Sequence, residues 1–370
     1  MTEVKSGGDA GGRGGGKTPQ DRQAQNASKQ SSQKRFKHKR RAPRLAALDL
    51  GTNNCRLLIA APSGKSLRIV DAYSQIVRLG EGLSKTGVLS QEAMQRTFGA
   101  LEACAEKIKR RGVTHMRCIA TQACRGAENG EEFLQEVKLR TGLEFEVIST
   151  EEEARLAVAG CAELIDDDAP SGLIFDIGGG STELSWVQRK QAGKPVEIAT
   201  WASMPFGVVS LSEKWGGRDI DAQTYADIVE EVRLAISELG DPEGLKNAFQ
   251  SGNAHLLGTS GTVTSIAGVH LRLRRYRRDK VDGLWLTARE ARGVSEKLRK
   301  MSFDERADEP CIGRERADLV VCGCAILDAL LHEWPAERIR VADRGLREGI
   351  LAELSLQARK ERNRRRRANR

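Results

Sequence analysis

Two segments of the chain share one pattern, and this pattern limits the fold more than any other feature. Each segment is an apolar run that ends in an aspartate, followed by a turn of small polar residues and a second apolar run. The first spans Leu45–Ile59 and the second Leu173–Val187, with Asp49 and Asp176 at equivalent positions 127 residues apart. Apolar runs on both sides of a glycine-containing turn predict a β-hairpin. Two hairpins at this separation predict two similar domains.

The two turns are rich in groups that can bind a phosphate chain. Glycine lets backbone N–H groups crowd around an anion, and Ser, Thr and Asn side chains add further donors. The aspartate before each turn suits a hydrated Mg²⁺ ion, which prefers oxygen ligands and keeps its waters. We therefore expect two facing hairpins that hold phosphates from both sides of a cleft. The predicted phosphate-binding residues are Gly51, Thr52, Asn53, Gly178, Gly179, Gly180 and Ser181.

A third glycine-containing segment, Gly258–Thr264, follows an apolar run and precedes a predicted helix. Its N–H groups and hydroxyls could contact a third part of the ligand through Gly258, Thr259 and Gly261. The alternative is a plain turn between a strand and a helix. A dinucleotide-binding fold is excluded because the glycines precede a strand rather than a helix, and the chain has no P-loop motif.

Elsewhere, short apolar runs alternate with stretches of helical periodicity, which predicts an α/β fold. The polar stretch Asp166–Ser171 is the best boundary, so we expect one domain over 44–168 and another over 169–343. A closing helix over 344–358 is expected to pack on the first domain. The local predictions are an N-cap at Ser90, a capping box at Asn129 and Glu132, a C-cap at Gly142, and helices around 208–240, 261–273, 287–300 and 315–333.

The net charge of +9 comes from the two ends of the chain. Residues 1–44 hold 12 Lys and Arg against three Asp and Glu, and residues 359–370 hold eight against one. The remaining body has 40 basic and 47 acidic residues, which excludes a basic nucleic-acid-binding body. We expect 1–43 and 359–370 to be disordered basic tails. They are either simply solvated or attract a polyanion such as RNA or polyphosphate.

The sequence also indicates a cytoplasmic protein. It has no apolar run of 18 residues and no apolar stretch behind the basic N-terminus, so we expect neither a membrane span nor a signal peptide. The eight cysteines form no C-x-x-C motif and most lie in apolar runs, as expected for reduced, buried residues. The pair Cys322 and Cys324 is only a weak metal-binding signal.

Taken together, the motifs resemble the exopolyphosphatase and guanosine pentaphosphate phosphohydrolase (Ppx/GppA) family of the actin-like superfamily. The resemblance covers about 44–356 and implies two actin-like (ribonuclease H-like) α/β domains with an interdomain cleft. The matching segments are Asp49-Leu-Gly-Thr-Asn53, Ala120-Thr-Gln-Ala-Cys-Arg125, Glu152-Glu-Ala-Arg155, Asp176-Ile-Gly-Gly-Gly-Ser-Thr-Glu183, Pro205-Phe-Gly207, Gly258-Thr-Ser-Gly-Thr262, Arg316-Ala-Asp318 and Asp343-Arg-Gly-Leu-Arg-Glu348.

The resemblance implies a Mg²⁺-dependent hydrolase that releases the terminal phosphate of inorganic polyphosphate, or converts guanosine pentaphosphate to the tetraphosphate. It implies that Glu153 is the general base for water and that Arg125 grips the phosphoryl group. It further implies that Asp176 and Glu183 hold Mg²⁺ and help position the water, with support from Asp49. Dimers and stimulation by K⁺ are also typical of the family. No additional His-Asp helical module follows Glu348, so we expect the short, two-domain form.

Alternatives remain for the residues and for the whole chain. Glu153 could instead form a helix capping box with Thr150. Arg125 could be a surface residue after a strand, and Glu183 could be a solvated residue at the start of a strand. Arg316 and Asp318 are interpreted as structural residues in the first turn of a helix. The chain could also be a kinase of the same superfamily, or a non-catalytic protein that binds guanosine tetra- or pentaphosphate or associates with RNA through its tails.

Overall fold

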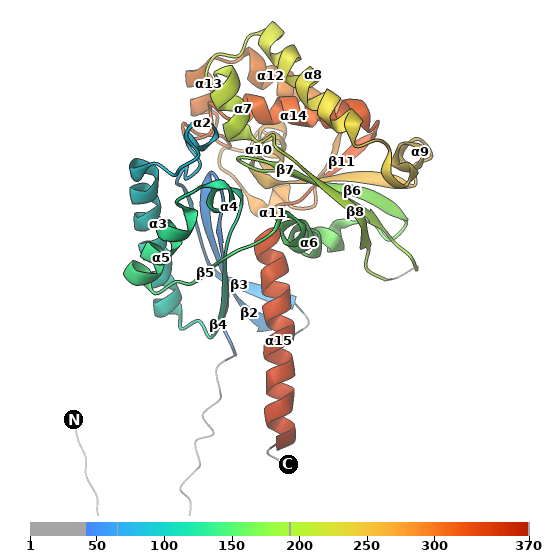
Figure 1. The fold of residues 1–370 in the computed structure, drawn as a ribbon. Coiled ribbons are helices and arrows are strands. Elements are labelled where there is room, and N and C mark those ends of the chain that lie inside the picture. Colours follow the sequence, from blue (N-terminus) through green and yellow to red (C-terminus); the bar gives the residue numbers. More distant parts are fainter. Residues whose placement is uncertain (1–41, 65, 192–193, 369–370) are drawn as a thin grey trace, which may run out of the picture. The chain divides into compact units, whose positions relative to one another are not determined.

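The computed structural model describes residues 42–64, 66–191 and 194–368, which belong to one compact unit, Ala42–Arg370. The predicted N-terminal tail lies outside these residues, except for Ala42 and Pro43. The described chain forms two β-sheets with helices on their faces (Figure 1). The predicted two-domain α/β fold is confirmed.

The two sheets share an arrangement of five strands, and the second sheet has one additional strand, β10, at its edge. The first has the strand order β3-β2-β1-β4-β5, and the second β10-β11-β9-β6-β7-β8. In each sheet an antiparallel hairpin (β1–β2 or β6–β7) lies beside a parallel strand (β4 or β9). The strands are β1 (Leu45–Leu50), β2 (Asn54–Ser63), β3 (Ser66–Ile76), β4 (His115–Ala120), β5 (Phe145–Val147), β6 (Ser171–Ile177), β7 (Thr182–Gln188), β8 (Glu197–Met204), β9 (Ala254–Thr259), β10 (Trp285–Thr287) and β11 (Arg338–Val341).

Helices cover both faces of each sheet, which explains why strands β1 and β6 are almost continuously apolar. On the first sheet, α3 and α5 cover one face, and α15 covers the other beside α6 (Figure 1). On the second sheet, α10, α12 and α14 cover one face and α6 the other. The helices are α2 (Leu83–Thr86), α3 (Gln91–Arg111), α4 (Gln122–Gly126), α5 (Gly130–Thr141), α6 (Thr150–Cys161), α7 (Val208–Trp215), α8 (Ala222–Glu238), α9 (Leu245–Gln250), α10 (Ser260–His270), α11 (Arg278–Val281), α12 (Ala288–Lys300), α13 (Phe303–Asp308), α14 (Val320–Glu333) and α15 (Leu346–Ala368), with 3₁₀ turns at Ala162–Leu164 and Pro242–Gly244.

Helix α6 packs against both halves of the structure. Leu156 belongs to the core beneath the first sheet, together with Ile350 and Leu354 of α15. Val158 and Cys161 belong to the core beneath the second sheet. A side chain at the start of α6 is therefore held in a fixed relation to both sheets.

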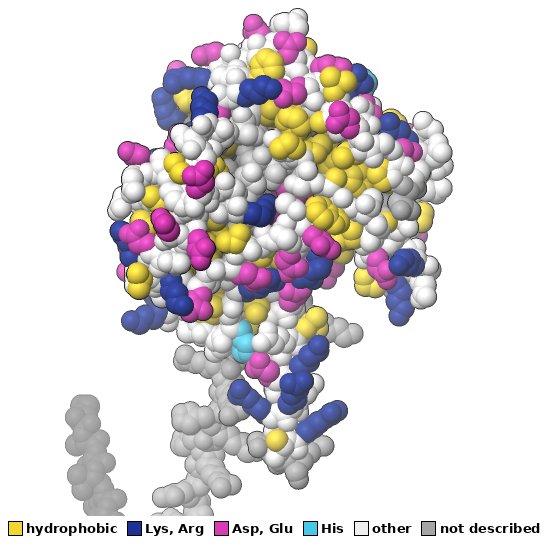
Figure 2. Space-filling view, in the orientation of Figure 1, with side chains coloured by type: hydrophobic (Ala, Val, Ile, Leu, Met, Phe, Trp, Pro, Cys, Tyr) yellow, Lys and Arg dark blue, Asp and Glu magenta, His cyan; other side chains and the backbone are white. Residues whose placement is uncertain are grey.

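The basic C-terminal segment is not the predicted disordered tail. Helix α15 continues to Ala368, and a hydrogen bond from Arg359 to the Gly64 carbonyl and an ion pair between His115 and Glu361 hold it against the first sheet. Arginine is a good helix former, so the segment extends the preceding helix. Figure 2 shows Lys and Arg side chains gathered along this helix where it leaves the body.

Several local predictions also need correction. Asn129 does not form a capping box with Glu132, because its side-chain amide makes two hydrogen bonds with the backbone of Leu89. The helix predicted around 208–240 is two helices, α7 and α8, and the one predicted at 315–333 begins only at Val320. The caps at Ser90 and Gly142 are confirmed.

All eight cysteines are buried and unpaired. They include the pair Cys322 and Cys324, which lies inside α14 in the core of the second domain. The helices of the described ranges include none with the length and apolar character needed to cross a membrane.

Candidate active site

The two predicted turns are closed by equivalent backbone hydrogen bonds. In the first, the Gly51 N–H donates to the Asn54 carbonyl at 2.9 Å; in the second, the Gly178 N–H donates to the Ser181 carbonyl at 2.9 Å. The turns also contact each other, since a Cβ atom added to Gly179 would lie 3.0 Å from Cβ of Thr52. Only glycine permits this approach without displacing the opposite turn. The hairpins thus meet at one place, between the two sheets.

A cavity of about 630 Å³ opens beside the touching turns. Both turns line it, together with the start of α6 and the start of α10. The cavity lining includes these residues predicted from the sequence: Asp49, Gly51, Thr52, Asn53, Glu153, Asp176, Gly178, Gly179, Gly180, Ser181, Glu183, Thr259 and Gly261. The structure therefore brings together residues from four distant parts of the sequence.

Two predicted site residues do not line this cavity. Gly258 lies in β9, where an added Cβ would collide with the ring of Phe175, so its role is close packing rather than ligand contact. Arg125 lies behind Glu153: its Nη1 donates to the Ile148 carbonyl at 2.7 Å and lies 3.3 Å from Oε2 of Glu153. The contact of Arg125 with a phosphoryl group stays a prediction.

Glu153 is a cavity residue and not a capping residue. The N-cap of α6 is Ser149, whose hydroxyl accepts from the N–H of Glu152, so the alternative capping box of Thr150 and Glu153 does not form. The side chain of Glu153 is 13% exposed. Burial, and next the nearby charge of Glu183, raises its pKa well above the ordinary value, while Arg125 opposes this shift.

Glu183 is buried as well, in contrast to the solvated strand end considered above. It is only 5% exposed, and its Oε1 accepts from the hydroxyls of Ser181 at 2.5 Å and Ser203 at 3.1 Å. Burial raises its pKa, and the two serine hydroxyls act in the opposite direction. The two hydrogen bonds hold this carboxylate in one orientation.

The two aspartates at the strand ends complete a cluster of four carboxylates. Burial raises the pKa of Asp49, and burial together with the charge of Glu183 raises the pKa of Asp176 to about 7. Arg56 lowers the pKa of both groups. Such mutual shifts of buried acids are typical of catalytic and cation-binding sites.

Several other residues line the cavity for which no ligand contact was predicted from the sequence. They are Arg56, Gln122, Tyr276, Arg278, Arg316, Arg347 and Glu348. Arg316 was interpreted as a residue in the first turn of a helix, but it precedes α14, which begins at Val320. Arg278 forms an ion pair with Glu348 at 2.6 Å, and the Tyr276 hydroxyl donates to Asp343 at 2.6 Å. Part of the signal was present in the sequence, because Arg316 and Arg347 lie inside segments that match the family motifs, and Arg56 lies three residues after such a segment.

Comparison with known proteins agrees with this geometry. The model of the Ppx/GppA phosphatase family matches residues 58–358. A Ppx/GppA family member from Aquifex aeolicus is 28% identical, with a TM-score of 0.70 over 85% of this chain and 98% of that one. A protein described as exopolyphosphatase-like is 29% identical, with a TM-score of 0.75 over 85% and 99% of the two chains. An exopolyphosphatase from Cytophaga hutchinsonii, 23% identical over 84% and 97%, shares the fold with a TM-score of 0.73.

Fold and site thus define a two-domain α/β protein with a cavity lined by both glycine-containing turns. The family match extends over most of the chain and includes the second hairpin, the start of α6 and the start of α10. The chain belongs to the Ppx/GppA phosphatase family, whose members hydrolyse phosphoanhydride bonds.

Proposed function

We propose that this protein removes the terminal phosphate from inorganic polyphosphate, from guanosine pentaphosphate, or from both, in a Mg²⁺-dependent reaction. The supporting observation is the position of Glu153, which lines one cavity with both glycine-containing turns. A carboxylate there can reach a water molecule beside a phosphate held by the turns. A Glu153 side chain pointing away from the cavity would argue against a hydrolase, but Glu153 lines the cavity.

The proposed reaction needs little covalent chemistry from the protein. The Glu153 carboxylate accepts a proton from water as the water oxygen attacks the terminal phosphorus atom. The bridging P–O bond then breaks, and its electron pair leaves with the shortened phosphate chain. Catalysis consists mainly of alignment and of neutralising the charge on the phosphate oxygens. The backbone N–H groups of the two turns would supply hydrogen-bond donors for the second task.

The carboxylate cluster fits a hydrated divalent cation. The buried Oδ1 of Asn53 has no protein partner, and the carboxylates of Asp49, Asp176 and Glu183 that line the same cavity offer oxygen ligands. Among the described residues, no three His, Cys, Asp or Glu side chains converge closely enough to bind a metal by themselves. This arrangement suits Mg²⁺ held by one or two of Asp49, Asp176 and Glu183, with waters and substrate phosphates as the other ligands. When bound, the ion would supply positive charge next to the phosphates.

The test compares two neighbouring glutamates on α6. Glu153→Gln should lower kcat by about 10²–10⁴-fold on the preferred substrate, because it removes the general base. Glu152→Gln is the matched control: Glu152 forms ion pairs with Arg117 and Arg155 outside the cavity, so its loss should leave kcat within about twofold.

Phosphate release would be measured with Mg²⁺ on inorganic polyphosphate and on guanosine pentaphosphate. Equal kcat for the wild type and Glu153→Gln would refute the assignment of the base. Tight binding of guanosine pentaphosphate without any phosphate release would favour the non-catalytic alternative. Phosphate transfer to an added alcohol, instead of release, would favour the kinase alternative.

A further inference from the structure

Residues 359–368 of α15 form a strongly basic segment, which we call the basic extension. Seven of these ten residues are Lys or Arg, and the segment is helical throughout. The last residue of α15 that belongs to a hydrophobic core is Ala358. About 15 Å of helix therefore follows the packed part of α15, and Figure 2 shows Lys and Arg side chains projecting from it.

Five basic side chains of the extension are exposed and have no hydrogen bond or ion pair within the described part of the chain: Lys360, Arg362, Arg364, Arg365 and Arg367. An α-helix has 3.6 residues per turn, so Arg362, Arg364 and Arg365 point to three different sides of the helix. Like charges three or four positions apart on a helix repel each other. A polyanion bound along the extension would remove this repulsion.

A purely structural role explains only part of this charge. Cations stabilise the C-terminal end of a helix, but this effect is confined to the last turn. The basic residues of the extension occupy more than two turns, from Arg359 to Arg367. Arg359 donates to the Gly64 carbonyl and Glu361 pairs with His115, so these two residues anchor the base of the extension. The basic residues that follow Glu361 are available for a ligand.

The composition of the extension limits the kind of partner. It contains no aromatic residue on which a base could stack, and no large apolar residue that could enter a membrane. A helix without an apolar face also cannot form a coiled coil. Six of its seven basic residues are Arg, whose planar guanidinium group matches the geometry of phosphate. The chemistry of the extension is therefore that of a binding surface for a phosphate backbone.

The extension is not a continuation of the cavity between the two glycine-containing turns. Arg347 lines that cavity, but α15 carries no Lys or Arg between Arg347 and Arg359, which is about 18 Å of helix. Beside this stretch, Arg117 and Arg155 both pair with Glu353, at 3.3 and 2.6 Å. No continuous row of free cations on α15 therefore leads a polyphosphate chain from the cavity to the extension.

We propose that the basic extension of α15 is an RNA-binding surface, which contacts the phosphate backbone of a folded RNA. Folded RNA presents phosphates along its grooves and around its loops, so it can contact a helix that is basic on several sides. Arginine-rich segments are a recurrent means of binding RNA. The body of the protein, with 40 basic and 47 acidic residues, repels RNA, so the extension determines where RNA binds. This surface lies outside the proposed function and requires no phosphate hydrolysis.

The test is the triple variant Arg362→Gln/Arg364→Gln/Arg365→Gln in the full chain. Gln is a good helix former like Arg, so the extension stays helical. Binding of a short RNA hairpin is measured by fluorescence anisotropy from about 50 to about 200 mM salt. The variant should bind RNA at least about tenfold more weakly. The slope of log K against log salt should decrease in magnitude by about two to three, because three phosphate contacts are lost.

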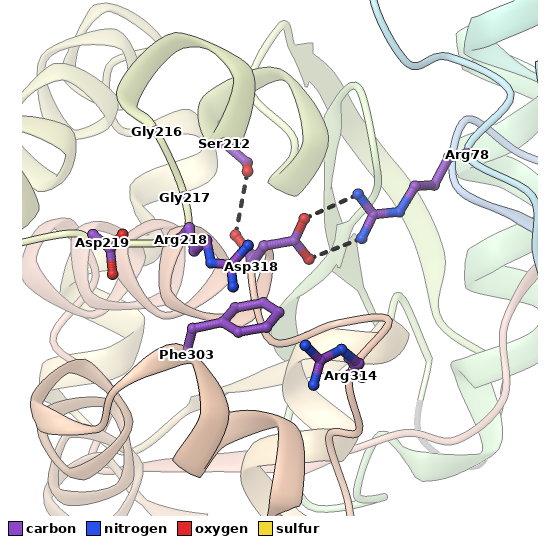
Figure 3. A pocket seen from close by; sticks show the side chains of 9 residues that line it. All are labelled: Arg78, Ser212, Gly216, Gly217, Arg218, Asp219, Phe303, Arg314 and Asp318. Atoms are coloured by element: carbon purple, nitrogen blue, oxygen red, sulfur yellow. Dashed lines mark hydrogen bonds and ion pairs between the residues drawn. The ribbon is translucent and has the colours of Figure 1, made fainter.

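Two control variants separate direct contact from net charge. Lys85→Gln/Arg289→Gln/Arg314→Gln removes the same charge from exposed residues elsewhere, and Arg314 lines a separate cavity (Figure 3). It should leave the salt slope unchanged, because these residues make no contact with the bound RNA. Lys at 362, 364 and 365 keeps the charge and should retain the wild-type slope. Contacts made by the basic segment 1–44 are the same in every variant.

The outcomes decide both the surface and its partner. Loss of affinity and of slope in the 362/364/365 Gln variant alone supports the surface, whether or not the protein hydrolyses a phosphoanhydride. An unchanged slope, or an equal loss in the control with Gln at 85, 289 and 314, would overturn it. Tighter binding of duplex DNA, or of inorganic polyphosphate with the same number of phosphates, would overturn RNA as the partner. Lower thermal stability with unchanged RNA binding would show that the arginines serve only the helix.

Discussion

The Glu153 carboxylate and the Arg125 guanidinium form an ion pair, with Oε2 and Nη1 3.3 Å apart. The same Nη1 donates to the Ile148 carbonyl at 2.7 Å, which fixes the arginine behind α6. Arg125 lowers the pKa of Glu153, while burial and Glu183 raise it. The ion pair therefore keeps the proposed base ionised at a lower pH than its surroundings alone would permit.

Loss of Arg125 should shift the pH dependence of catalysis. A general base works only as the carboxylate, so kcat/KM rises with pH through the pKa of Glu153. Arg125→Gln removes the group that lowers this pKa, so the acidic limb of the profile should move to higher pH by about one unit. Profiles of phosphate release from pH 5 to 9 would measure the shift. Arg117→Gln is the control, because Arg117 pairs with Glu146 and Glu152. A uniform loss of rate, with the acidic limb at the same pH, would show that Arg125 does not set the pKa of the catalytic base.

The raised pKa of Asp176 predicts how stability changes with pH. The pKa of the Asp176 carboxyl group is about 7 in the folded protein and near 3.8 in the unfolded chain. Between these two pH values the folded state therefore binds more protons than the unfolded state. Stability of the ligand-free protein should therefore fall as pH rises from about 4 to about 7. Asp176→Asn should relieve this loss of stability. The difference in free energy of unfolding between Asp176→Asn and the wild type should be about 2 kcal/mol more in favour of the variant at pH 8 than at pH 5.

Urea unfolding at the two pH values, without divalent cations, would test this prediction for Asp176. Added Mg²⁺ should stabilise the wild type at pH 8 and have little effect on Asp176→Asn, since the cation needs the ionised carboxylate. If the difference in free energy of unfolding between Asp176→Asn and the wild type were equal at both pH values, the pH dependence of stability would not come from titration of Asp176.

Local patterns predicted the hairpins, but only the folded chain could show which side chains meet. The turns at Gly51 and Gly178 were readable because an apolar strand, a buried aspartate and a glycine-containing turn occur in succession. The N-cap of α6 is Ser149, one residue before the Thr150 of the alternative capping box, and a difference of one residue at a helix end is enough to make a cavity residue resemble a capping residue. The three arginines that line the cavity, Arg56, Arg316 and Arg347, had no local signal as a group, because more than 250 residues of chain separate Arg56 from Arg316.

The packing of Gly207 is another feature that local sequence patterns could not reveal. The sequence placed it in a matching segment without a role, and the structure puts its Cα against the second turn. A Cβ atom there would collide with the carbonyl of Gly179 and lie 2.5 Å from the Gly180 nitrogen, both of which are backbone atoms that cannot rotate away. The position of the turn therefore depends on a glycine 28 residues further along the chain.

Gly207→Ala should damage the site more than the fold. The new methyl group should displace the turn that carries Gly179 and Gly180, and misplaced donors should lower kcat/KM by about 10²-fold. Unfolding free energy should fall by about 1–3 kcal/mol, as is typical of overpacking. Gly99→Ala in α3 is the control: nothing lies within 4 Å of its added Cβ, so activity should be unchanged and stability slightly higher. Retention of full activity by Gly207→Ala would show that the turn tolerates the shift.

A bidentate ion pair links the two halves of the protein on another side of the cleft. Both oxygens of Asp318 accept from Arg78 at 2.9 Å, and the two side chains are 22% and 30% exposed (Figure 3). Asp318 was interpreted from the sequence as a helix-dipole residue, but it precedes α14 and instead connects to the loop that follows β3. Glu213 of α7 makes a second connection, accepting from the Gly82 N–H and the Ser84 hydroxyl at 2.7 Å each.

A double-mutant cycle on Arg78→Gln and Asp318→Asn would measure this link. Because the pair is bidentate and mostly shielded from water, we expect a coupling free energy of about 1 kcal/mol in urea unfolding. Each single variant should also raise KM, since Asp318 lies two residues after Arg316 and loss of the pair loosens that segment of the cavity wall. The double variant should have a free energy of unfolding no lower, and a KM no higher, than either single variant. Strictly additive effects on stability and on KM would mean that the two residues act separately and that the Glu213 contacts alone hold this side of the cleft together.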